Sequence, residues 1–210
     1  MTLLPALTLG LALGVRHATD ADHIAAVGTI ARHGGSPRHS ALVGAWWGAG
    51  HSASVLLAGG ALVMLRLPMP VRVALALEFL VALMLIGLGA RSLLARGYGG
   101  RASALRPALV GVMHGLAGSA VLALLVIATT DTALGALLYL LCFCVGTTVG
   151  MAAVSALFAL PARLGAGRAM ALERTIRVAA GVASIAIGLS IAHRVGFQDG
   201  LFAATPFLGP

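Results

Sequence analysis

The chain has 210 residues, of which 60% are hydrophobic and only 10% are charged, and its mean hydropathy is +1.01. Because a soluble globular domain carries roughly 25% charged residues, this composition excludes a water-soluble fold. The net charge of +8 comes from 14 arginines between apolar runs, which indicate membrane topology and headgroup contacts and not a nucleic-acid surface.

Six hydrophobic runs, bounded by arginine, glycine or proline, predict six transmembrane helices. In chain order they cover Leu3–Arg32, Ser40–Leu65, Val71–Ala95, Pro107–Ala128, Thr132–Leu160 and Ala171–Val195. A bilayer core of about 30 Å needs roughly 20 apolar residues per helix, so the chain has room for these helices and short connections. We therefore expect an all-α, polytopic membrane helix bundle of about six helices that forms a single domain over residues 1–210.

The arginines divide unevenly between alternate connections. One side carries Arg32, Arg38, Arg91, Arg96, Arg101, Arg106, Arg163, Arg168, Arg174 and Arg177, and the other carries Arg66, Arg72 and Arg194. Since cytoplasmic loops are enriched in arginine, the first side is predicted to be cytoplasmic and both termini to lie outside. Glu78, near the outer end of the third run, is expected at the membrane interface in an ion pair with Arg72.

The two halves of the chain, 1–100 and 101–210, carry similar motifs at an offset of about 95 to 97 residues. The matches are Gly50-His51-Ser52 with Gly146-Thr147-Thr148, Leu77-Glu78 with Leu172-Glu173, and His17 with His114. Three helices per half would form an inverted repeat, which places a transporter's substrate site near the midplane. Chance similarity between helices rich in alanine, glycine and leucine is the alternative.

Pairs of glycines four residues apart recur in the predicted helices. They are Gly10/Gly14, Gly44/Gly48, Gly111/Gly115 and Gly146/Gly150. Lipid offers no hydrophobic drive for helix association, and small residues let backbones approach closely. The pairs therefore predict a tightly packed bundle.

A polar segment, Arg16-His17-Ala18-Thr19-Asp20-Ala21-Asp22-His23, interrupts the first apolar run. The run is about 45 Å long as a helix, so the segment is predicted near mid-membrane. Ionisable groups there are costly unless they are paired, ligated or hydrated. A bound cation would account for two imidazoles and two carboxylates together, and these ligands suit nickel, cobalt or zinc. The alternative is an Arg/Asp/His network that only joins helices.

A regular helix cannot present all four of these groups to one ion. At about 100° per residue, His17, Asp20 and His23 share an arc of about 120°, whereas Asp22 points elsewhere. The sequence therefore predicts either a local break in the helix, as in broken transporter helices, or an Asp22 that orients an imidazole or pairs with Arg16.

Other polar residues at membrane depth could complete the site. His51 lies mid-helix beside glycines that let another backbone approach, and we predict that it is a metal ligand. His114 is a further candidate, although a structural histidine bonded to a carbonyl fits it equally well. Arg16 and Thr147 are additional candidates for the transport path.

The segment from Arg16 to Ile24 resembles the signature of the nickel/cobalt transporter family of secondary permeases, including its His-x4-Asp-His element, and Gly50-His51-Ser52 resembles that family's second motif. The resemblance implies a multi-pass protein of the bacterial plasma (inner) membrane. It also implies that metal recognition involves His17, Asp20, Asp22, His23 and His51.

The chain departs from the family pattern in two respects. We expect no helix ahead of the signature helix, and the later Asp/Thr-rich motifs are replaced by His114-Gly115-Leu116-Ala117-Gly118-Ser119 and by Gly150-Met151 followed by Ser155. The chain thus resembles a short, divergent six-helix member, of the kind linked to the supply of nickel to urease.

The resemblance and the ligand chemistry together predict a permease for nickel or cobalt uptake, with Ni²⁺ or Co²⁺ as substrate and no cofactor. No nucleotide-binding Gly-x4-Gly-Lys-Ser/Thr motif is present, and we expect no nucleotide or nucleic-acid partner. An efflux permease, an intramembrane zinc metalloenzyme without a His-Glu-x-x-His element, and a subunit of a larger uptake complex remain alternatives. The sequence also leaves a homo-oligomer open.

Overall fold

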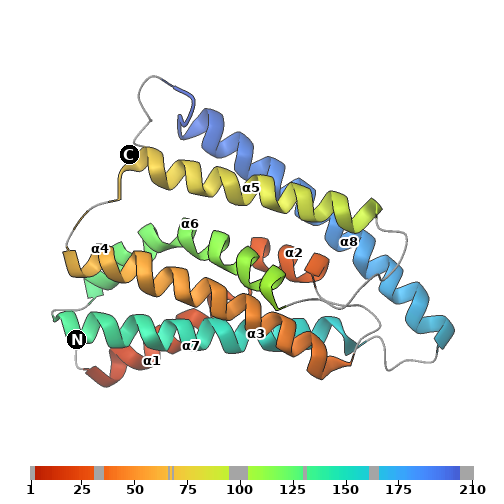
Figure 1. Ribbon diagram of the computed structural model, residues 1–210, viewed down its shortest axis with the longest axis horizontal. Helices are drawn as coiled ribbons and strands as arrows, with labels where there is room; N and C mark the ends of the chain where they lie inside the picture. The colour runs from red at the N-terminus through yellow and green to blue at the C-terminus, as the bar shows by residue number, and fades with distance from the viewer. Residues whose placement is uncertain are drawn as a thin grey trace.

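The computed structural model describes residues 3–30, 36–65, 67, 69–94, 104–129, 132–160 and 166–203, and all regular structure in this part of the chain is helical (Figure 1). Several arginines that contribute to the predicted orientation lie outside the described residues, namely Arg32, Arg66, Arg96, Arg101 and Arg163. The elements are α1 (Leu3–His17), α2 (Ala21–Ile30), α3 (Pro37–Ser54), η1 (Val55–Gly59), α4 (Gly60–Leu65), α5 (Val71–Leu94), α6 (Leu105–Thr129), α7 (Ala133–Phe158), α8 (Ala166–His193) and η3 (Arg194–Gln198), where η marks π-helical turns.

The predicted apolar runs correspond closely to these elements, with one change in the first run. Within the described residues, four segments are long and apolar enough to cross a membrane, namely Pro37–Leu65, Val71–Leu94, Ala133–Phe158 and Ala171–Gln198. The chain is therefore a multi-pass membrane protein, as its composition predicts. The first run is not one continuous helix, because α1 ends at His17 and α2 begins at Ala21.

The helices pack as two groups with α2 and α6 between them (Figure 1). Helices α5 and α8 lie side by side, and α3 contacts both α7 and α6, while α1 contacts α7. The short helix α2 packs against α8 and α5. Helix α1 begins and η3 ends at the same end of the bundle (Figure 1). The broken first helix starts at this end and shares the interior of the bundle with α3 and α6.

Glycines at the helix contacts allow the close approach that the glycine pairs predict. A Cβ added at Gly14 of α1 would lie 2.1 Å from the carbonyl oxygen of Phe143 in α7, and one at Gly111 of α6 would lie 2.0 Å from that of Trp47 in α3. Neither distance can accommodate a methyl group, so these backbones touch directly. The prediction of a tightly packed bundle is confirmed.

Hydroxyl groups add hydrogen bonds between helices in the apolar interior. The Ser52 Oγ of α3 donates to the carbonyl of Cys144 in α7 at 3.1 Å, and the Ser184 Oγ of α8 donates to the carbonyl of Leu85 in α5 at 2.7 Å. Cys142 and Cys144 are free thiols, which fits their positions two residues apart on one helix, where side chains point to different faces. The bundle is thus held by backbone contacts and by hydroxyl-to-carbonyl bonds.

The break in the first helix is a tight turn made by Ala18, Thr19 and Asp20. The backbone N–H groups of Thr19 and Asp20 donate to the carbonyls of Arg16 and His17 at 2.8 and 3.0 Å, which is the three-residue spacing of a tightened helix end. The Thr19 hydroxyl also donates to the Arg16 carbonyl at 2.6 Å and so competes for a helical acceptor. Helix α2 restarts when Ile24 donates to the Asp20 carbonyl at 2.9 Å.

We expect Gly111→Ala to lower the unfolding temperature of the detergent-solubilised protein, because the new methyl group would overlap the Trp47 carbonyl and overpacking costs about 1–3 kcal/mol. Gly87→Ala is the matched control, since a Cβ at Gly87 in α5 meets nothing within 4 Å. The control should unfold at or above the wild-type temperature. Equal unfolding temperatures for the two variants would contradict this packing.

Candidate metal site

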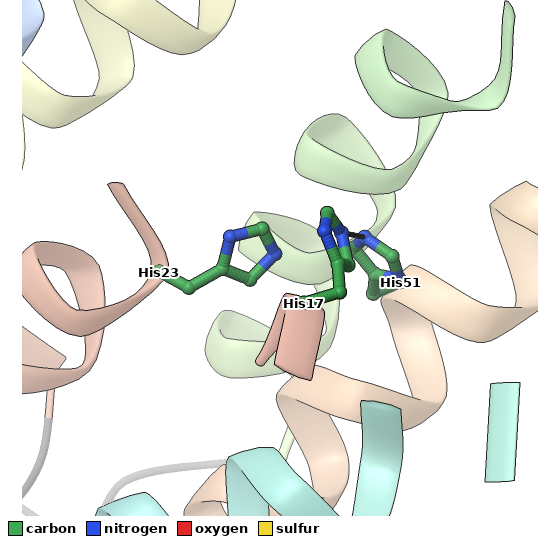
Figure 2. A group of neighbouring side chains, drawn as sticks. All are labelled: His17, His23 and His51. Atoms are coloured by element: carbon green, nitrogen blue, oxygen red, sulfur yellow. Dashed lines mark hydrogen bonds between the residues drawn. The ribbon is translucent and has the colours of Figure 1, made fainter. Parts of the chain in front are cut away.

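Four histidines from four different helices meet beside the break, and we call them the histidine cluster: His17 (α1), His23 (α2), His51 (α3) and His114 (α6). The last three are buried, with exposed fractions of 1%, 0% and 4%. The ring centroids of His17 and His23 are 4.4 Å apart, and those of His23 and His114 are 4.1 Å apart. Figure 2 shows the rings of His17, His23 and His51 approaching one another from their separate helices.

His17 is held between a carboxylate and a second imidazole. Its Nδ1 lies 2.8 Å from Asp20 Oδ2, and its Nε2 lies 3.4 Å from Nε2 of His51 (dashed in Figure 2). The carboxylate places the ring proton on Nδ1 and leaves the Nε2 lone pair directed at His51, as in the carboxylate–histidine–metal arrangement. A metal bound at about 2.1 Å by two tetrahedral nitrogen ligands separates them by about 3.4 Å, so the pair has the spacing of two ligands to one ion.

His23 completes a group of three imidazoles. His17, His23 and His51 each offer a ring nitrogen, and these nitrogens lie within 4.8 Å of one another. Nε2 of His23 and Nδ1 of His51 are buried and have no hydrogen-bond partner among the described residues. Because a buried polar atom without a partner is costly, Nε2 of His23 is suited to a ligand that accepts its lone pair, whereas Nδ1 of His51 is the ring nitrogen opposite the one that faces His17.

Asp22 connects two of the histidines across the break. Its Oδ1 accepts from the backbone N–H of His23 at 2.9 Å and lies 3.0 Å from His23 Nδ1, and its Oδ2 lies 2.9 Å from His114 Nε2. Both alternatives predicted for the first helix therefore occur together, since the helix breaks and Asp22 also orients imidazoles. Arg16, the other partner considered for Asp22, is exposed on α1.

A cavity of about 190 Å³ adjoins the cluster. His17, His23, His114 and Asp22 line it together with Glu78 of α5 and Ile191 of α8. Glu78 forms an ion pair with Arg194 in η3, and Arg194 also lies 3.7 Å from Asp199. Arg72, the partner expected for Glu78, donates to the carbonyl of Ala203 at 3.3 Å. The sequence did not predict that Glu78 lines the cavity or pairs with Arg194. Both depend on how α5 packs against α8 and η3, which no local sequence pattern indicates.

Aromatic residues form the apolar surroundings of the imidazoles. The Phe143 ring lies 5.4 Å from that of His17, and the Trp47 ring lies 5.4 Å from that of His23. Phe143 carries no sequence signal that distinguishes it from other apolar residues of its run. Thr147, one turn further along α7, is fully buried and its hydroxyl donates to the Phe143 carbonyl at 2.9 Å, so that hydroxyl is engaged within its own helix.

The chain is similar over almost its whole length to a curated protein, urease accessory protein UreH of Bacillus sp. (strain TB-90), with 32% identity over 219 residues. The alignment covers 95% of this chain and 96% of that protein. The chain belongs to the UreH family. No family model matches the chain, and no solved structure matches it. The UreH match spans the helices that carry the histidine cluster, and the name of that relative connects it with urease.

We expect Asp20→Ala to weaken the binding of Co²⁺ to the purified protein about 10–100-fold, because His17 would lose the carboxylate that orients its ring. Isothermal titration calorimetry would measure the change. Asp20 is half exposed, so the variant should unfold at a temperature close to that of wild type. Unchanged Co²⁺ affinity would show that Asp20 does not support a metal ligand.

Proposed function

We propose that this protein is a permease of the nickel/cobalt transporter family that carries Ni²⁺ or Co²⁺ into the cell across the plasma membrane. The observation that carries the proposal is the arrangement of His17 and His51, whose Nε2 atoms lie 3.4 Å apart beside His23 inside a multi-pass bundle. The signature from Arg16 to Ile24 supports the same function.

The ligand set favours nickel or cobalt. Imidazoles with supporting carboxylates suit borderline divalent ions, whereas copper(I) favours thiolates and magnesium favours oxygen ligands. The thiol of Cys144 instead donates to the Ser52 carbonyl at the α3–α7 contact. Membership of the UreH family supports nickel, because short members of the transporter family are linked to the supply of nickel to urease.

We propose six membrane crossings arranged as a 3+3 inverted repeat, in which α1 and α2 together form one broken crossing and α6 forms another. In this repeat α1 corresponds to α6, α3 to α7 and α5 to α8. The α1–α7 contact is then equivalent to the α6–α3 contact, and the α3–α7 and α5–α8 contacts each join a helix to its own equivalent. Ser52 and Thr148, equivalent at the proposed offset, bond to each other at 3.0 Å. His17 and His114, also equivalent, both belong to the histidine cluster.

The cavity supports entry from outside. It is lined by Ala74 and Glu78 near the start of α5 and by Ile191 near the end of α8, and both helix ends lie where α1 begins (Figure 1). The arginine distribution predicts that end to face outward. A potential of 100 mV is worth about 4.6 kcal/mol for a divalent ion, which favours inward movement without a second energy source.

We expect His17→Ala and His51→Ala to reduce the uptake of radiolabelled nickel and cobalt by proteoliposomes to the level of empty liposomes. Each variant removes one nitrogen from a three-nitrogen site at mid-membrane. Thr147→Val is the matched control, because Thr147 is equally buried but its hydroxyl bonds within α7, and it should transport within about twofold of wild type.

Wild-type uptake by a well-folded His17→Ala variant would refute the site. Absence of uptake by the wild-type chain alone would instead favour a subunit of a larger complex.

We expect an inside-negative potential of 100 mV to support accumulation of the ion by more than about a thousandfold, and we expect collapse of the potential to abolish it. The measurement is steady-state nickel content in proteoliposomes with an imposed potassium gradient and valinomycin. Accumulation that survives the loss of the potential would require a coupling ion. Movement of nickel outward against this potential would favour efflux.

A further inference from the structure

We propose that the transported ion occupies two overlapping positions in turn, which share His23. The entry position is formed by Asp22, His23 and His114, and the inner position is formed by His17, His23 and His51. In each group the three ligand atoms lie within 4.8 Å of one another. This inference rests on the proposed function, since it describes how the same cluster would pass its ion onward.

The entry position has its own ligand chemistry. Asp22 bonds to Nδ1 of His23 and to Nε2 of His114, and each bond places the proton on that ring nitrogen. The opposite nitrogens, Nε2 of His23 and Nδ1 of His114, are buried without a hydrogen-bond partner among the described residues. Each of these two imidazoles therefore carries, on the nitrogen that faces away from Asp22, a lone pair that no described residue uses.

The ring of His23 lies between the two positions. Its centroid is 4.4 Å from that of His17 on one side and 4.1 Å from that of His114 on the other, whereas the rings of His51 and His114 are 6.3 Å apart. The rings of His51 and His114 are thus farther from each other than either is from the ring of His23. Two divalent ions bound to one shared imidazole would repel each other. We therefore expect only one of the two positions to be filled at a time.

The cavity sets the order of the two positions. Asp22, His23 and His114 line it together with His17, while His51 is fully buried and is not among the lining residues. An ion that enters this cavity past Glu78 therefore reaches the ligands that line it, Asp22 and His114 among them, before it reaches His51. Because His23 stays bound throughout, the ion exchanges ligands stepwise and is never stripped of all of them.

The test is Co²⁺ binding to the purified, detergent-solubilised protein, followed by calorimetry and by the visible absorption of the ion, which reports its ligands. Wild type should bind one Co²⁺ per chain. His51→Ala and His114→Ala should each still bind one Co²⁺, about 10–100-fold more weakly or with a changed spectrum, because one position survives in each. His23→Ala should lose binding at both positions.

His193→Ala is the matched control, because His193 is exposed at the end of α8, and it should bind Co²⁺ as wild type does. Size-exclusion profiles and unfolding temperatures would verify that every variant is folded.

Two bound ions per wild-type chain would overturn the proposal that the two positions are filled in turn. Complete loss of binding in both His51→Ala and His114→Ala would also overturn it, because that result would indicate a single four-ligand site. An unaltered affinity and spectrum in either variant would also overturn it. By contrast, a wild-type protein that binds no Co²⁺ at all would refute the proposed function itself.

Discussion

Ala18, Thr19 and Asp20 leave the helical path between α1 and α2, and this short turn determines which groups meet inside the bundle. A continuous helix would direct Asp22 away from the arc shared by His17 and His23. The turn changes the direction of the chain, so that Asp20 supports His17 while Asp22 reaches both His23 and His114. The backbone N–H groups of Ala18, Thr19 and Asp20 donate to carbonyls at the end of α1, and such pairing is required at membrane depth.

The packing around the turn depends on small residues. Gly14 brings α1 against α7, and Gly111 brings α6 against α3, with no room for a methyl group at either contact. Together with the α3–α7 contact, these two contacts bring the helices that carry His17, His51 and His114 to the same place. In lipid, where apolar side chains gain little by burial against each other, such backbone contacts are an important source of helix association. The same glycines therefore serve both the fold and the site.

Two carboxylates orient three of the four imidazoles. Asp20 bonds to His17, and Asp22 bonds to His23 and His114. The Asp20 bond directs the Nε2 lone pair of His17 toward His51, and the rings of Phe143 and Trp47 form an apolar wall beside the imidazoles. Burying groups of this kind is costly unless they are paired, ligated or hydrated, which is the physical basis of the proposal that they bind an ion.

The sequence by itself determined the membrane class, the extents of most helices, the small-residue contacts and the polar segment around His17, because hydropathy, glycine spacing and charge are local properties. It also predicted that a regular helix could not present His17, Asp20, Asp22 and His23 together. Only the tertiary structure decided that the helix breaks, that Asp22 bonds to His114, and that Glu78 pairs with Arg194. These contacts join residues 92 and 116 positions apart, and such pairs follow from how helices pack, which no local pattern encodes.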